Sequence, residues 1–240
     1  MDTKKMINEI ENRREQMLKN YEILSNNDKN DIYWCIIPER AKKGYIFELG
    51  MVINWIGLKY KPKKILEIGT RTGGSLIHLL SSYNVYDDLE IFCFDYWQYP
   101  PDESAIKNLY RFVPSPIKKM IFKKYYMKKI EKNLNLFKIP IENINFISGD
   151  SKSTVPNFFK NNPNKQFDYI LVDGGHDKFT ASTDLENVVG HVASGGVIVF
   201  DDLERENLLK VWNQFKEKHS DEFYFFDKIH RKGIGWGFKK

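Results

Sequence analysis

The chain has 240 residues, of which 42% are hydrophobic and 15% aromatic, a balance typical of a globular protein with one sizeable core. The net charge of +5 is modest and does not by itself indicate nucleic-acid binding. No apolar run approaches the roughly 20 residues that span a bilayer, and the charged N-terminus is not a secretory signal. Because Cys35 and Cys93 lack metal-ligand spacing, we expect a cytoplasmic protein without disulfides or zinc.

Residues 1–60 are expected to form a helical cap ahead of the main domain. Apolar residues at helical spacing predict one helix over 2–26, which stops at Asn26-Asn27-Asp28. A second helix is expected to begin after Pro38 and to run toward Gly57.

From residue 61 onward, short apolar segments alternate with helical stretches. Five segments read as buried strands that end in Gly or Asp: 63–69, 89–95, 144–150, 167–175 and 195–202. The helical stretches are 74–84, 151–161, 178–191 and 203–218. This alternation predicts an α/β, doubly wound, mostly parallel sheet over 61–240, closed by strands at 222–229 and 233–240 with a hairpin-like turn between them. Ligands bind outside the carboxyl ends of such strands, so the Gly and Asp endings should converge on one crevice.

The turn after the first strand reads EIGTRTGGS over residues 67–75. Its spacing is not that of a dinucleotide-binding loop, because Arg71 occupies the place of the second glycine, and no G-K-[ST] follows as in a P-loop. Glu67 disfavours a pyrophosphate beside this turn and suits a cationic ligand such as S-adenosylmethionine (SAM). The SAM carboxylate can use the start of the following helix. A turn that serves only strand–helix packing is the alternative.

The segment LEIGTRTGGS resembles motif I of class I SAM-dependent methyltransferases, and the resemblance covers about 61–240. It implies a Rossmann-like, seven-stranded sheet and SAM as the cofactor. Asp95 matches the family's acid that bonds the ribose hydroxyls, and Asp150 and Ser151 match its adenine contacts. The alternative for Asp95 is a solvated loop carboxylate. Asp150 is also placed to be the N-cap of the following helix, a role compatible with the adenine contact. The implied cofactor-binding residues are Glu67, Gly69, Thr70, Gly73, Ser75, Asp95, Asp150 and Ser151.

Three aspartates end the fourth and fifth strands: Asp173, Asp201 and Asp202. Carboxylates gathered in one cleft need protons or a cation to compensate them, and an all-oxygen set suits Mg²⁺ or Ca²⁺. The arrangement resembles the macrocin O-methyltransferase and cephalosporin hydroxylase-like group (Methyltransferase 24 type), in which these positions hold magnesium against acceptor hydroxyls. The resemblance therefore implies that all three aspartates are metal ligands. In the alternative, one Asp contacts substrate or SAM and Asp202 caps the following helix.

The sequence departs from that group after the fourth strand. Relatives often read D-G-D-H there, and the second Asp is a proposed base, whereas this chain has Gly175. His176 follows and is the candidate to take the proton, so the catalytic candidates are His176 and Asp173. A histidine that orients substrate or stabilises the loop is the alternative.

A basic insert occupies about residues 100–140. Phe122, Tyr126, Ile130 and Leu134 recur every four residues and predict a basic amphipathic helix. One interpretation is a solvated lysine face over a packed stripe, and the other is a lid or substrate wall that attracts phosphate. RNA or an anionic membrane would also be attracted. The flanking lysines are Lys118, Lys119, Lys123, Lys124, Lys128, Lys129 and Lys132.

Together these features predict a SAM-dependent, Mg²⁺-assisted O-methyltransferase that acts on a small acceptor, a saccharide or a nucleotide-sugar. An RNA methyltransferase is ranked lower, because no RNA-binding aromatic motif is evident. A non-catalytic scaffold with the same fold is the third hypothesis. Analogy with relatives suggests a homo-oligomer, for which the helical N-terminus is a candidate contact.

Overall fold

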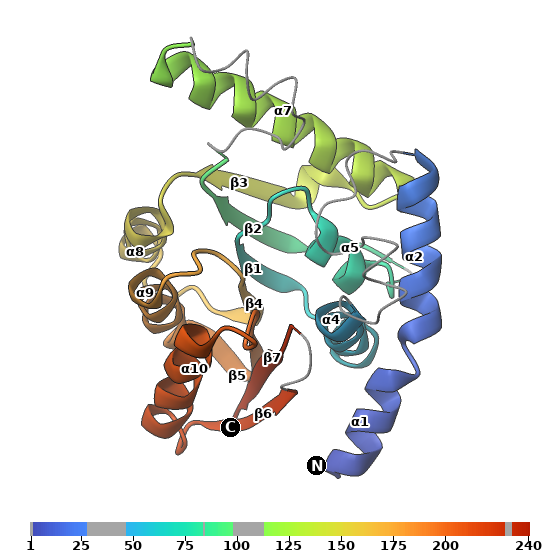
Figure 1. Ribbon diagram of the computed structural model, residues 1–240, viewed down its shortest axis with the longest axis vertical. Coiled ribbons are helices and arrows are strands. Elements are labelled where there is room, and N and C mark those ends of the chain that lie inside the picture. The colour runs from blue at the N-terminus through green and yellow to red at the C-terminus, as the bar shows by residue number, and fades with distance from the viewer. Residues whose placement is uncertain (1, 28–46, 84, 98–112, 229–231) are drawn as a thin grey trace.

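The computed structural model describes residues 2–27, 47–83, 85–97, 113–228 and 232–240, and its centre is one seven-stranded sheet (Figure 1). The strand order is β3-β2-β1-β4-β5-β7-β6. All neighbours pair in parallel except at β7, which runs antiparallel to both β5 and β6. The strands are β1 Lys64–Ile68, β2 Glu90–Asp95, β3 Ile144–Ser148, β4 Phe167–Val172, β5 Val192–Phe200, β6 Phe223–Lys228 and β7 Ile234–Lys239.

Helices cover both faces of the sheet, as Figure 1 shows. Helices α8, α9 and α10 lie on one face, and the N-terminal helices, α4 and α5 lie on the other. Among the described residues, no helix combines the length and apolar character needed to cross a membrane. The helices are α1 Thr3–Glu11, α2 Arg14–Asn27, α4 Phe47–Tyr60, α5 Gly74–Leu80, α7 Ser115–Leu136, the 3₁₀ turn η2 Ile141–Asn143, α8 Ser151–Asn161, α9 Lys178–Val189 and α10 Glu206–Lys218.

Each face of the sheet has its own hydrophobic core. Successive side chains of a strand point to opposite faces, so Ile65 packs with α4 and α5 while Leu66 packs with α8, α9 and α10. The strand order reverses between β1 and β4, which is where open α/β sheets bind their ligands. The predicted doubly wound, mostly parallel α/β sheet is confirmed.

The N-terminal cap differs from the predicted single helix over 2–26. The helix is divided at Asn12, the C-cap of α1, and α2 begins at Arg14. The break allows the Arg13 Nε to donate to the Oδ1 of buried Asn54 at 2.7 Å, and the Asn54 Nδ2 donates to the carbonyl of His78 in α5 at 2.7 Å. The cap is therefore joined to α5 by buried polar contacts as well as by packing. Cys35 and the expected helix start after Pro38 lie outside the described residues.

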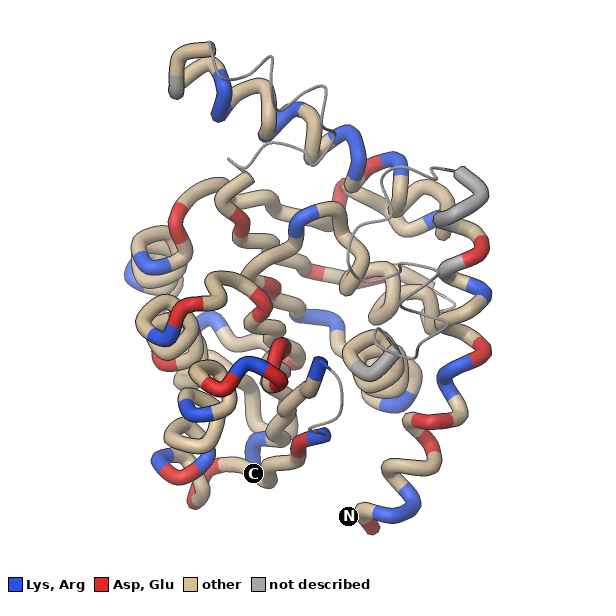
Figure 2. Tube along the Cα trace, in the orientation of Figure 1, with Lys and Arg blue, Asp and Glu red and all other residues tan. Residues whose placement is uncertain are grey.

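Helix α7 packs as predicted for a basic amphipathic helix. Its stripe of Phe122, Tyr126, Ile130 and Leu134 is buried. Lysines face outward on the other side, so basic residues recur along the helix (Figure 2). The exposed lysines are Lys119, Lys123, Lys124, Lys128 and Lys132.

The packing of α7 predicts how its apolar residues affect stability. Ile130 is fully buried, so Ile130→Ala should lower the free energy of unfolding by roughly 2–5 kcal/mol, from lost burial and the cavity left behind. The control is Met120→Ala on the same helix, which is 67% exposed and should change stability by less than about 0.5 kcal/mol. Urea denaturation of both variants measures the difference, and equal effects would contradict the packing of α7.

Candidate active site

The loop after β1 lies directly against the end of β4. Gly69 has φ 95°, and its N–H donates to the carbonyl of Phe94 at 2.8 Å. A Cβ at Gly69 would overlap the carbonyl oxygen of Asp173, so only glycine fits this close approach of two backbones. The loop of residues 69–73, which is predicted to bind the cofactor and is called the cofactor loop below, thus lies beside Asp173, a predicted metal ligand.

Glu67 is buried at the end of β1, beneath this loop. The Ser75 hydroxyl, in the first turn of α5, donates to its Oε1, and its Oε2 has no hydrogen-bond partner among the described residues. Burial is the main reason that the pKa of Glu67 rises to about 7, and the charge of Asp95 adds to it. Thr70, also a predicted cofactor residue, is buried too.

Asp95, at the end of β2, holds the same loop from the other side. Its Oδ2 accepts from the backbone N–H of Arg71 at 2.7 Å, and its Oδ1 accepts from the N–H of Trp97 at 2.8 Å. The Trp97 indole in turn donates to the carbonyl of Arg71 at 3.1 Å. The alternative of a solvated loop carboxylate is therefore wrong, because Asp95 orders the loop. The sequence prediction missed Trp97, whose only signal was its place two residues after Asp95.

Helix α7 covers the glycine loop. The Asn133 side-chain amide donates to the carbonyl of Thr72 at 3.1 Å, and Ile130 packs over Gly73. Gly73 has φ 81° and is the N-cap of α5. The basic insert therefore forms one wall of the loop, a contact that no sequence pattern indicated.

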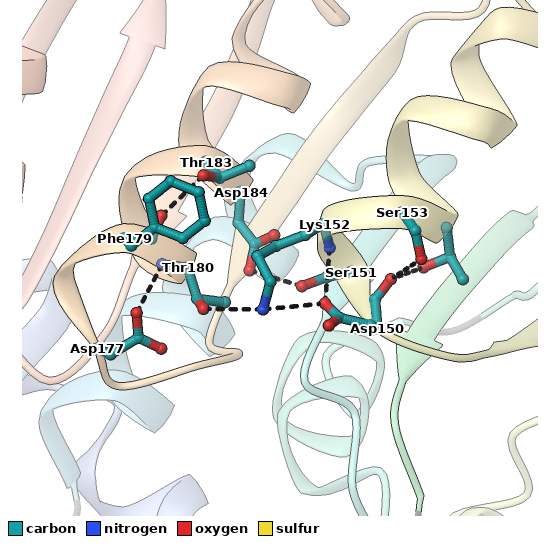
Figure 3. A network of polar contacts seen from close by, with 10 residues as sticks. Asp150, Ser151, Lys152, Ser153, Asp177, Phe179, Thr180, Thr183 and Asp184 are labelled. Carbon is teal, nitrogen blue, oxygen red and sulfur yellow. Dashed lines mark hydrogen bonds and ion pairs between the residues drawn. The ribbon is translucent and has the colours of Figure 1, made fainter.

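Asp150 and Ser151 lie at the start of α8, after β3 (Figure 3). Asp150 accepts from the N–H of Lys152 at 3.0 Å, which confirms the N-cap interpretation. The Ser151 hydroxyl donates to the Oδ2 of Asp184 in α9 at 3.0 Å, and the Lys152 ammonium donates to the Thr180 hydroxyl at 3.2 Å. These contacts fix α8 against α9. Burial raises the pKa of Asp184 to about 6.

The three predicted metal ligands meet at one point beyond β4 and β5. One oxygen each of Asp173, Asp201 and Asp202 lie within 4.8 Å of one another. Asp201 and Asp202 are buried, and burial together with the charge of Asp201 raises the pKa of Asp173 well above its usual range. Burial also raises the pKa of Asp201, against the lowering effect of Lys232. We call these three residues the acidic cluster.

Basic side chains surround the acidic cluster. The Lys232 ammonium lies 2.8 Å from the Oδ1 of Asp202, the His176 Nδ1 lies 2.9 Å from its Oδ2, and the Arg205 Nε lies 3.6 Å from that Oδ2. Although burial acts to raise it, the hydrogen bond from His176 and the charge of Lys232 lower the pKa of Asp202. The alternative that Asp202 caps the next helix is wrong, because α10 begins at Glu206 with Arg205 at its N-cap.

The acidic cluster suits a hard divalent cation. All its donors are carboxylate oxygens, which Mg²⁺ and Ca²⁺ prefer. The Oδ1 of Asp201 is buried without a hydrogen-bond partner among the described residues, as expected for a ligand atom directed at an ion. The sequence prediction passed over two neighbours of the cluster, Arg205 and Lys232, and Lys232 stood out only as part of a turn.

The seven-stranded fold, with the loop after β1 beside the acidic cluster, is that of a class I methyltransferase. A family model described as a methyltransferase domain (Methyltransf_24) matches residues 66–203, which is more than half of the chain. The chain belongs to this methyltransferase family, and the prediction of a SAM-dependent enzyme of this group is confirmed. None of the curated proteins compared with the chain matches it.

Solved structures with the same fold include three methyltransferases. The O-methyltransferase NovP has a TM-score of 0.61 and 16% identity, with 94% of this chain and 98% of that chain covered. TomG from Streptomyces achromogenes, an O-methyltransferase solved with SAM, has a TM-score of 0.58 and 12% identity over 93% and 89%. PaMTH1 from Podospora anserina, solved with S-adenosylhomocysteine, has 0.57 and 14% over 100% and 97%.

The buried carboxyl of Glu67 predicts a specific pH dependence of stability. Its folded pKa of about 7 exceeds the unfolded value, so its contribution to stability is full at acid pH and is lost as pH rises through 7. The free energy of unfolding of the wild type, relative to Glu67→Gln, should fall by on the order of 3 kcal/mol between about pH 4 and pH 8.

Urea denaturation of both proteins across this range measures the effect. Glu206→Gln is the control, because Glu206 is exposed and its pairing with Lys210 lowers its pKa, so it should not show the fall. A constant difference between wild type and Glu67→Gln would show that Glu67 does not titrate as a buried carboxyl.

Proposed function

We propose that this protein transfers the methyl group of SAM to a hydroxyl of a small acceptor, with the help of a divalent cation. The observation that carries the proposal is the contact of the Gly69 backbone with Asp173, which sets the cofactor loop beside the acidic cluster. Donor and acceptor sites that adjoin in this way suit an in-line transfer, whose rate depends on alignment. The O-methyltransferases among the structural neighbours agree with transfer to oxygen.

The SAM site would be built from the loops after β1, β2 and β3. Bound SAM supplies an electrophilic methyl group. Asp95 offers a carboxylate to the ribose hydroxyls. Glu67 lies buried beneath the loop with a raised pKa, and a bound cationic ligand would favour its ionised form. The remaining residues proposed for this site are Gly69, Thr70, Gly73, Ser75, Asp150 and Ser151.

The acceptor site would be built on the acidic cluster, with Asp173, Asp201 and Asp202 as the ligands. A divalent cation, when bound, supplies a Lewis acid that lowers the pKa of the acceptor hydroxyl and fixes its position. The buried, unpartnered Oδ1 of Asp201 supports this assignment.

His176 is proposed to take the proton of the acceptor. Its Nδ1 lies 2.9 Å from the Oδ2 of Asp202, so a proton on Nδ1 donates to that carboxylate and leaves the Nε2 lone pair available. Its side chain is about half exposed, which lets Nε2 reach a substrate and pass the proton to water. Asp202 thereby orients the base.

A saccharide or nucleotide-sugar is the acceptor class that we favour. Helix α7 presents exposed lysines and contacts the cofactor loop through Asn133, so a phosphate group near the site would meet a positive field. Cytoplasmic location and a homo-oligomer remain predictions from the sequence.

Binding of S-adenosylhomocysteine tests the donor site separately from catalysis. Asp95→Asn removes a charged hydrogen-bond acceptor and should weaken binding by roughly 10- to 100-fold in calorimetry. Asp88→Asn is the control, because Asp88 is exposed and pairs with Lys63, which lies at the opposite end of β1 from the loop. Equal affinities of both variants for S-adenosylhomocysteine would remove Asp95 from the site.

Removal of the metal tests the acceptor site. A chelator should abolish turnover of SAM with a panel of nucleotide-sugars, and added Mg²⁺ should restore it. Asp201→Asn should lower kcat by at least about 100-fold and leave the affinity for S-adenosylhomocysteine nearly unchanged, since only the acceptor site loses a ligand. Asp227→Asn is the control, because the carboxylate of Asp227 on β6 pairs with Lys216 of α10. Full activity with the chelator present would refute metal assistance.

A further inference from the structure

Lys232 reaches into the acidic cluster from the segment before β7. Its ammonium lies 3.3 Å from the Oδ2 of Asp201 and 2.8 Å from the Oδ1 of Asp202. The two carboxylate side chains are 1% and 4% exposed, and the lysine side chain is 26% exposed. This is a mostly buried ion pair, whose geometry matters far more than that of a surface pair.

The backbone fixes Lys232 in this place. The N–H of Leu203 donates to the carbonyl of Gly233 at 3.1 Å, and the N–H of Glu204 donates to the carbonyl of Lys232 at 2.8 Å. Gly233 has φ 69°, and a Cβ there would lie 2.8 Å from the Cβ of Leu203. The start of β7 is therefore held against the segment that follows β5, where acidic residues gather (Figure 2).

The basic side chains around the cluster do not have equal roles. His176 and Arg205 both face the Oδ2 of Asp202, and their side chains are about half exposed. Lys232 contacts both carboxylates of the pair and so offsets the repulsion between them. A divalent cation bound by the same oxygens would provide the same compensation, and two cations sharing these oxygens repel each other strongly at low effective dielectric.

We propose that Lys232 is a built-in counter-ion of the acidic cluster, which a divalent cation must displace from Asp201 and Asp202 in order to bind. The inference rests on the metal site of the proposed function. In the metal-free protein, only those molecules in which Lys232 has moved away from Asp201 and Asp202 can bind the cation. The apparent affinity for the cation is therefore reduced by the fraction of molecules in that state. Lys232 would thus keep the metal-free site folded and set how tightly it binds metal.

Calorimetric titration of the full-length protein with Mg²⁺, and with Mn²⁺ in parallel, tests the proposal. Lys232→Met removes the competing charge but keeps an apolar stem, so it should bind Mg²⁺ at least about tenfold more tightly than wild type. Lys232→Arg retains a cation and should bind like wild type. Lys216→Met is the matched control, a lysine that is 27% exposed and paired with Asp227 away from the site. Lys232→Gln serves if Lys232→Met does not fold.

Thermal unfolding supplies the second readout. Without metal, Lys232→Met should have a lower Tm than wild type, because the buried carboxylates lose their partner, and Mg²⁺ should raise its Tm by more than that of wild type. A purely structural lysine would show the loss of Tm without tighter metal binding.

The outcomes separate this proposal from the proposed function. If wild type binds Mg²⁺ and Lys232→Met binds it no more tightly, the counter-ion role is refuted and the metal site stands. If Lys232→Met binds Mg²⁺ more tightly than wild type, the counter-ion role is supported. If Lys232→Met binds Mg²⁺ and wild type does not bind it at all, the counter-ion role is still supported, but metal assistance in the native enzyme is refuted. If neither protein binds Mg²⁺ or Mn²⁺, both proposals about the metal are refuted, and S-adenosylhomocysteine binding still reports on the donor site.

Discussion

The close approach of two backbones, Gly69 and Asp173, is the constraint on which the site depends. It lies where the strand order reverses between β1 and β4, so the loop after one strand meets the end of the other. The parallel pairing of β1 with β4 brings the two segments together, and the missing Cβ allows the contact. The loop after β1 and the acidic cluster lie side by side as a direct result.

Charge balance is the second constraint on this site. The protein gathers Glu67, Asp201 and Asp202, which are buried, and Asp173, which is partly buried. Desolvation raises the pKa of most of these carboxyl groups. Asp202 is the exception, because His176 and Lys232 contact it directly. Burial of this kind costs stability unless each charge has a proton, a partner or a metal, which is typical of functional sites rather than structural ones.

The basic insert joins the site through packing rather than charge. The apolar stripe of α7 places Ile130 over Gly73 and Asn133 beside Thr72, so the helix stabilises the cofactor loop whatever its lysines attract. Its buried and charged faces therefore have separate roles. A change in the lysines need not alter the loop, whereas a change in the stripe should.

The sequence alone determined the order of strands and helices, the glycine turn and the acidic strand ends, because these depend on local periodicity and on residues that end strands. It also determined that Asp173, Asp201 and Asp202 would meet, since parallel strands bring their carboxyl ends to one edge. The partners from distant segments come from the tertiary structure: Lys232 contacts the cluster, Trp97 contacts Arg71 and Asn133 contacts Thr72. These contacts depend on how the segment after β2, the long insert and the antiparallel strand β7 fold back on the sheet, which no local spacing encodes.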